Sequence, residues 1–117
     1  MKIAHLIEKV QAHYQLAPDY PFEKHPDIFV FRHTKNKKWL CLYAEIKTQA
    51  LFSEEEKKIP LINVKVRPDE MTQLLATDGI LPAYHMNKKH WVSVLLDKAS
   101  DELIWELVNH SYELTKK

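Results

Sequence analysis

The sequence has 117 residues, 45% of them hydrophobic and 28% charged, which is typical of one soluble globular domain and excludes a disordered or fibrous chain. Its 17 basic and 16 acidic residues give a net charge of +1, so a nucleic-acid site would have to be a local basic patch. The single Cys41 excludes an internal disulfide and fits a reducing compartment, and the single Gly79 excludes a glycine-rich phosphate loop.

The chain begins with a predicted helix over about residues 2–14. Apolar residues recur there at helical spacing, namely Ile3, Leu6, Ile7, Val10 and Tyr14. Glu8 and Lys9 interrupt the apolar run that a signal peptide needs, and no stretch of about 18 apolar residues predicts a membrane span. We therefore expect a cytoplasmic protein without a membrane partner.

A proline-rich connection and a hairpin are predicted next. Pro18, Pro21 and Pro26 exclude a helix up to about Asp27. Residues 28–33 and 39–46 are rich in aromatic and branched side chains, which favours two strands joined by a basic turn. The second strand is apolar on both faces, with one face expected to carry Trp39, Cys41 and Tyr43 and the other Leu40, Leu42 and Ala44.

The middle of the chain is predicted to hold a polar segment, a strand and a short helix. Residues 47–58 resemble an exposed loop or a marginal helix, since an acidic run is usually solvated. The next strand alternates buried Ile62, Val64 and Val66 with a polar, basic outer face of Asn63, Lys65 and Arg67. Pro68 then begins a short helix that runs to about Ala76.

The last third is predicted to contain a strand and a helix. After the polar block 82–91, one side of the strand carries His90, Val92, Val94 and Leu96, and the other carries Trp91, Ser93 and Leu95. Ser100 is a good N-cap for a final helix that ends near Lys116. Residues 1–117 are thus expected to form a single α+β domain with an antiparallel sheet and two long terminal helices packed on one face.

Four motifs resemble the MmcQ/YjbR family. They are Tyr20-Pro21-Phe22, Ile62-Asn63-Val64-Lys65 followed by Pro68-Asp69-Glu70, Pro82-Ala83-Tyr84-His85-Met86-Asn87-Lys88-Lys89-His90-Trp91, and Ser111-Tyr112-Glu113-Leu114. The resemblance implies a CyaY-like (frataxin-like) fold and a small DNA-binding protein. Ala83 replaces a common glycine of the family, and Val66-Arg67 replaces a common Cys-Asp pair. Iron binding is not carried over, because Glu8 is the only acid in the first helix.

The long motif is the candidate DNA-binding surface, provided that its strand neighbours the strand of residues 62–66. Lysines would position phosphates, Asn87 could meet a base edge and Trp91 could stack on an exposed base. The full set is Lys65, Arg67, His85, Asn87, Lys88, Lys89, His90 and Trp91. A structural alternative places Tyr84 and Trp91 in the core, with Trp91 beneath the terminal helices and residues 87–89 as a solvated turn. Lys35, Lys37 and Lys38 could add a second basic wing or serve only solubility.

Other kinds of site have weaker support in the sequence. No carboxylate or cysteine accompanies His85 and His90, so neither a metal nor another cofactor is expected. Cys41 lies between leucines without a local base, which predicts a packed residue and a protein that is not an enzyme.

The alternative to DNA binding is a protein-interaction or ligand-binding module that uses the open sheet face, with a monomer favoured. In this reading, strand 39–46 leaves an apolar patch that either recruits a partner or is covered by residues 47–58.

Overall fold

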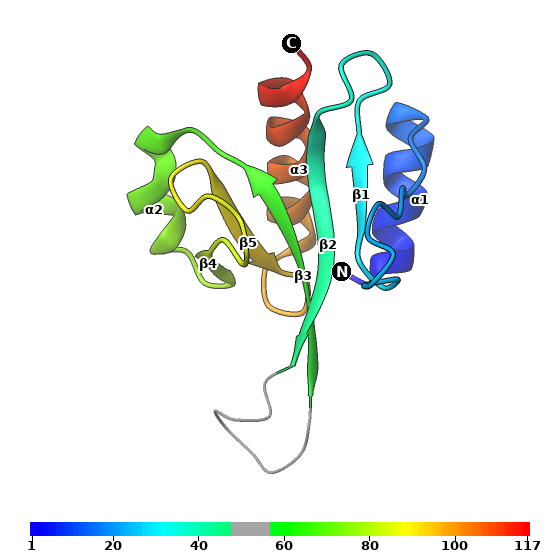
Figure 1. The fold of residues 1–117 in the computed structure, drawn as a ribbon. Helices are drawn as coiled ribbons and strands as arrows, with labels where there is room; N and C mark the ends of the chain where they lie inside the picture. The colour runs from blue at the N-terminus through cyan, green and yellow to red at the C-terminus, as the bar shows by residue number, and fades with distance from the viewer. Residues whose placement is uncertain (48–56) are drawn as a thin grey trace.

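The computed structural model describes residues 1–47 and 57–117, and an antiparallel sheet with the strand order β1-β2-β3-β5-β4 lies at its centre (Figure 1). This α+β architecture confirms the predicted fold class. The elements along the chain are α1 (Ile3–Tyr14), β1 (Phe29–Arg32), β2 (Trp39–Lys47), β3 (Lys58–Lys65), the 3-10 turn η1 (Pro68–Glu70), α2 (Met71–Leu75), β4 (Ile80–Pro82), β5 (Trp91–Leu95) and α3 (Asp101–Thr115).

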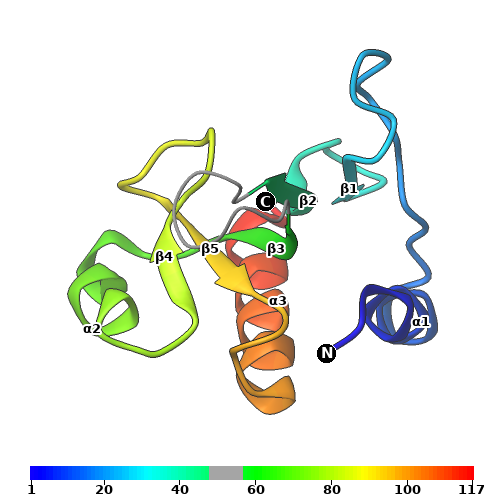
Figure 2. The same ribbon diagram turned by 90° about the horizontal axis from the view of Figure 1, so that it is seen from below.

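One face of the sheet carries the main hydrophobic core. Buried side chains of α1 and α3, including Leu6, Val10 and Ile104, pack with one set of strand residues. Figure 2 shows α1 and α3 on the same side of the sheet. The segment between α1 and β1 and the segment between β4 and β5 rise on the other side. We call that other side the helix-free face, since it is the face on which the candidate site lies.

Strand β2 departs from the predicted alternation at Leu40. Phe31 pairs with Cys41 and Arg32 pairs with Trp39, so Leu40 is an extra residue without a partner on β1. Such a bulge turns two successive side chains to one side. Leu40 therefore joins Cys41 in the core under the helices, and Trp39 joins the helix-free face, which corrects the expected grouping.

A serine of α3 bridges β2 and β3 beside this bulge. The Ser111 hydroxyl donates to the Leu40 carbonyl at 2.5 Å and accepts the Lys65 N–H at 2.9 Å. Both groups would otherwise be unpaired strand atoms, which are costly to bury. Ser111 is fully buried, and its hydroxyl fixes the backbone of Lys65 at the end of β3.

The short elements between β3 and β5 differ in how well the sequence predicted them. The expected helix from Pro68 to about Ala76 is present as η1 followed directly by α2. The short strand β4 was not predicted, because three residues with a proline carry almost no strand signal.

At the end of the chain, Ser100 caps α3 as predicted by accepting the Leu103 N–H at 3.1 Å.

The segment 47–58 lies mostly outside the described residues, so the expected loop or marginal helix there is not described. Its two ends are strand residues instead, because Lys47 pairs with Lys58 at the end of the β2–β3 ladder. No helix among residues 1–47 and 57–117 is long and apolar enough to cross a membrane.

Cys41 is a packed residue, as predicted. It is 1% exposed in the core under the helices, and this burial raises the pKa of its thiol far above the ordinary range. Because the thiolate is the reactive form, we expect a maleimide to label the native protein much more slowly than the urea-unfolded protein. Labelling of the native protein as fast as a free thiol would contradict this burial.

Candidate nucleic-acid interface

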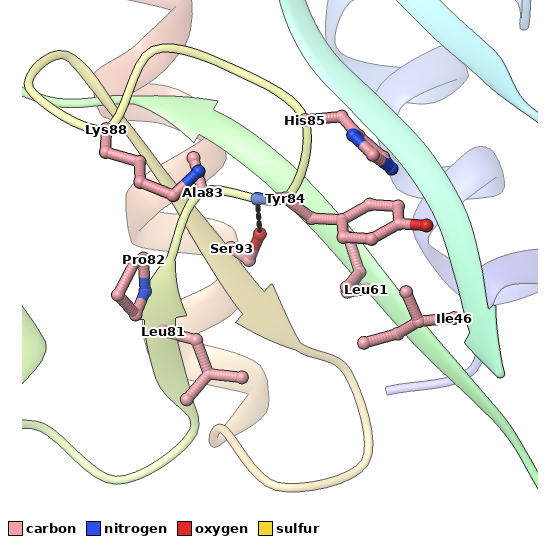
Figure 3. Close-up of a pocket in the computed structure, with 9 residues that line it drawn as sticks. All are labelled: Ile46, Leu61, Leu81, Pro82, Ala83, Tyr84, His85, Lys88 and Ser93. Atoms are coloured by element: carbon pink, nitrogen blue, oxygen red, sulfur yellow. Dashed lines mark hydrogen bonds between the residues drawn. The ribbon is translucent and has the colours of Figure 1, made fainter. Parts of the chain in front are cut away.

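The motif loop, defined as residues 83–90 between β4 and β5, is fastened to the sheet by two buried polar side chains. The Asn63 amide donates to the Tyr84 carbonyl at 2.8 Å. The Tyr84 N–H donates to the Ser93 hydroxyl at 2.9 Å, as Figure 3 shows. The Ser93 hydroxyl in turn donates to the Asn63 side-chain oxygen at 2.5 Å. This closed network holds both backbone groups of Tyr84 over the helix-free face.

Asn63 thus has a different environment from the solvated outer face that the sequence predicted. Its side chain is fully buried, and it faces Ser93 in the register of β3 and β5. The motif loop covers this position, and that cover comes from a segment about twenty residues further along the chain. Neither Asn63 nor Ser93 stood out as a site residue. Their sequence signal is weak: each is a polar residue between apolar neighbours in a strand, and Asn63 also belongs to one of the family motifs.

Asn87 acts as a turn residue within the motif loop. Its side-chain oxygen accepts the N–H groups of Lys89 at 2.8 Å and His90 at 3.3 Å, and its carbonyl accepts the Trp91 N–H at 3.0 Å. Asparagine commonly holds turns in this way. The amide nitrogen of Asn87 has no partner in the described part of the chain, so a base edge would meet a donor only.

Trp91 and Lys65 lie side by side on the helix-free face. They are register partners on β5 and β3, and the Val66 N–H extends this ladder to the His90 carbonyl at 2.9 Å. The condition that the two strands are neighbours is therefore met. Val92 points into the core beneath the helices, so Trp91 points the opposite way and is partly exposed. The structural alternative is therefore wrong for Trp91 beneath the helices and for Tyr84 in the core, since Tyr84 is 38% exposed. Its solvated turn at residues 87–89 is confirmed.

The lysines of the motif loop are exposed and unpaired with acids among the described residues. Neither Lys88 nor Lys89 takes part in an ion pair there. Lys88 lines a small hollow together with Tyr84, which is itself 38% exposed (Figure 3). Both ammonium groups are thus available to an anion.

Arg67 is less available, because acidic groups surround it. The Arg67 guanidinium lies 3.8 Å from the Asp69 carboxylate, and the Arg67 backbone N–H donates to the Glu70 carboxylate at 3.2 Å. Burial alone would raise the pKa of Glu70, but the hydrogen bonds from His110 and Arg67 outweigh it and lower that pKa. A negative charge therefore stays beside Arg67, which makes it a weaker phosphate-binding residue than Lys88.

Histidine 85 bears the backbone bend of the motif loop. It has a φ of 54°, in the left-handed region that few residues adopt, while Ala83 has no positive φ. The substitution of alanine for a family glycine at position 83 therefore costs nothing in backbone strain. The His85 ring lies 4.1 Å from the Tyr84 ring, edge to face, and both are exposed.

The second basic wing is the turn between β1 and β2. One of its residues binds the end of α3, since the Asn36 amide donates to the Thr115 carbonyl at 2.9 Å. Another binds the residue after the helix, since the Lys38 ammonium donates to the Lys117 carbonyl at 2.5 Å. Lys35 and Lys37 remain exposed. The turn thus has a structural role, and its two remaining lysines lie on a connection separate from the motif loop.

For metals, no group of three or more histidine, cysteine or acidic side chains gathers within the two described ranges.

Three comparisons place the chain among known proteins. The family model described as YjbR matches residues 11–114. The chain is 37% identical over 112 residues to the uncharacterized protein YyaQ of Bacillus subtilis (strain 168), covering 95% of both chains.

Two solved structures are similar in fold. A crystal structure of a Pseudomonas syringae protein has a TM-score of 0.91 and 39% identity, with 98% of this chain and 99% of that one covered. The crystal structure of Deinococcus radiodurans protein DR2400, with domain DUF419, has a TM-score of 0.73 and 25% identity, with 99% and 79% covered.

Proposed function

The chain belongs to the MmcQ/YjbR family, and from that premise we propose that it is a small DNA-binding protein that uses the motif loop and the adjoining ends of β3 and β5. We also infer that its fold is CyaY-like, since a helix from each end of the chain contributes to the core under one face of an antiparallel sheet. The proposal concerns binding and includes no catalytic step.

The observation that carries the proposal is the pairing of Trp91 with Lys65 on the helix-free face. An indole offers a flat surface for a base, and an ammonium beside it can bind the adjacent phosphate. Lys88 and Lys89 extend the positive charge into the motif loop without acidic partners among the described residues. The combination of stacking and charge is the chemistry that single-stranded nucleic acid requires.

The rigidity of the motif loop supports the same conclusion. The Asn63–Ser93 network fixes Tyr84, and the Asn87 turn fixes Lys89 and the strand entry at Trp91. A preordered backbone loses less conformational entropy on binding. The loop therefore holds the backbone of its two lysines in place and leaves only their side chains to be ordered by a ligand.

The test measures binding of labelled single-stranded and duplex DNA at several salt concentrations. Changing Lys88 and Lys89 together to alanine should weaken binding to every sequence and flatten the plot of log affinity against log salt by about 0.9 per lost duplex-phosphate contact. The matched control changes Lys2 and Lys98, two exposed lysines outside the motif loop, to alanine. This double variant removes the same net charge as the change of Lys88 and Lys89. Equal loss in both double variants would show a general charge effect and contradict a local site.

Trp91→Leu separates stacking from charge. We expect it to leave the salt slope nearly unchanged and to weaken single-strand binding by about 1–3 kcal/mol, more than duplex binding, because only an unstacked base can meet the indole. A folded Lys88/Lys89 double variant that binds DNA with unchanged affinity and slope would refute the proposed site. Equal loss of single-strand and duplex affinity in Trp91→Leu would refute stacking.

A further inference from the structure

We propose that a hollow on the helix-free face, separate from the Trp91–Lys65 pair, binds a small amphipathic anion with an apolar body and a carboxylate-type head. The hollow has a volume of about 830 Å³ and lies between the motif loop and the segment that precedes β1. This volume is within the range of typical small-molecule sites. The inference does not depend on DNA binding.

The floor of the hollow is apolar and belongs to β2. Leu42, Ala44 and Ile46 are alternate residues of this strand and therefore point to the same face. Ala44 is 2% exposed and contributes only a methyl group between two larger side chains. The floor consequently presents mainly aliphatic carbon to an apolar ligand body.

Two walls enclose this floor, and Figure 2 shows the segments that carry them rising from the sheet on the side away from α1 and α3. One wall contains Phe22 and Ile28, and the other contains Tyr84 and Met86. Phe22 packs edge to face on Trp39 with ring centroids 5.7 Å apart, and the Asn63–Ser93 network holds Tyr84. Both walls are thus formed before any ligand arrives.

The polar lining of the hollow favours an anion. His25 from one wall and His85 from the other can donate hydrogen bonds, and the ammonium of Lys88 lines the adjoining hollow, which shares Ile46 and His85 (Figure 3). The one carboxylate among the described lining residues, Glu45, hydrogen-bonds Tyr43.

Tyr43 and Glu45 are alternate residues of β2, and Tyr43 lies in the core beneath the helices. The Glu45 carboxylate is therefore directed to the opposite face, and donors dominate the inner rim of the hollow. A buried apolar body with one anionic head matches this pattern better than a cation or an uncharged hydrocarbon would.

Naphthalene-2-carboxylate is a suitable probe, with naphthalene-2-carboxamide as the neutral compound of the same shape. We expect saturable binding of the carboxylate by calorimetry, with amide chemical-shift changes concentrated in residues 22–28, 42–46 and 84–88. The carboxamide should bind more weakly, because it carries no charge for the donors at the rim. Shift changes centred elsewhere, or the absence of saturable binding at millimolar probe, would overturn the proposal.

Ala44→Phe fills the floor and should lower carboxylate affinity at least about tenfold. Ala12→Phe is the matched control on the exposed side of α1 and should leave affinity unchanged. If Ala44→Phe does not fold, His85→Gly takes its place, because a φ of 54° suits glycine and the change keeps the backbone unstrained.

His85→Gly should lower the affinity for the carboxylate more than the affinity for the carboxamide. An equal loss of affinity for the two probes in His85→Gly would exclude the hollow as the anion site. A folded Ala44→Phe variant with unchanged affinity for the carboxylate would exclude it as well. Chemical-shift changes that instead follow an added peptide library, with no response to either probe, would reassign the hollow to a protein partner and refute the small-molecule proposal.

Discussion

Leu107→Ala is expected to lower the free energy of unfolding by about 2–5 kcal/mol, the largest single effect that we predict from packing. Leu107 is 6% exposed on the inner side of α3, within the core cluster that also contains Ile104 and residues of β2 and β3. Removing its side chain loses buried apolar area and leaves a cavity that a helix held against a sheet fills only in part.

Denaturant unfolding at constant protein concentration checks this value. Glu106→Ala is the matched control, because Glu106 is the exposed neighbour on the same helix and its replacement should change stability by less than about 0.5 kcal/mol. A loss for Leu107→Ala within that same small range would show that α3 does not pack as described.

Asn63→Ala is expected to destabilise the protein by about 2–4 kcal/mol, although it removes only one polar side chain. It leaves the buried Ser93 O–H without its acceptor and the partly buried Tyr84 carbonyl without its donor, and each unpaired buried group costs about 1–3 kcal/mol. The free Tyr84 carbonyl also loosens the motif loop, so hydrogen exchange of the Tyr84 amide should accelerate more than that of the amides in the core strands.

A double-mutant cycle with Ser93→Ala isolates the network. The two side chains bond to each other and to Tyr84. The sum of the two single-variant losses in the free energy of unfolding should therefore exceed the loss in the double variant by about 0.5–3 kcal/mol. Additive effects would mean that the two side chains act independently. Unchanged exchange at Tyr84 would mean that the motif loop is held by other contacts.

Several features followed from the sequence, because they depend on local spacing alone. The alternation of β5 placed Trp91 on the face opposite Val92, and the structure confirms this. The cap at Ser100 was predicted from a residue type and its position relative to an apolar stripe. The neighbourhood of Lys65 and Trp91 was predicted only as a condition, and the β3–β5 register fulfils it.

The errors arose where a distant segment decides the local structure. The bulge at Leu40 depends on how β2 pairs with β1 and on the Ser111 hydroxyl, some seventy residues away. Asn63 was predicted to be solvated. The alternation of apolar and polar residues in one strand shows that Asn63 points away from the core under the helices, but it does not show what covers the opposite face. The motif loop buries that side, and this cover is invisible in the sequence of the strand.

Hydrophobic periodicity and caps act over a few residues, so the amino-acid pattern alone predicts the α+β class, the order and type of most elements, and which residues of β5 face away from the helices. The strand order, the bulge, the Asn63–Ser93 network and the hollow between Phe22 and Tyr84 depend instead on tertiary contacts. Each of these joins segments far apart in the chain. Their arrangement is fixed by the joint burial of apolar surface and the pairing of buried polar groups, which no single segment specifies.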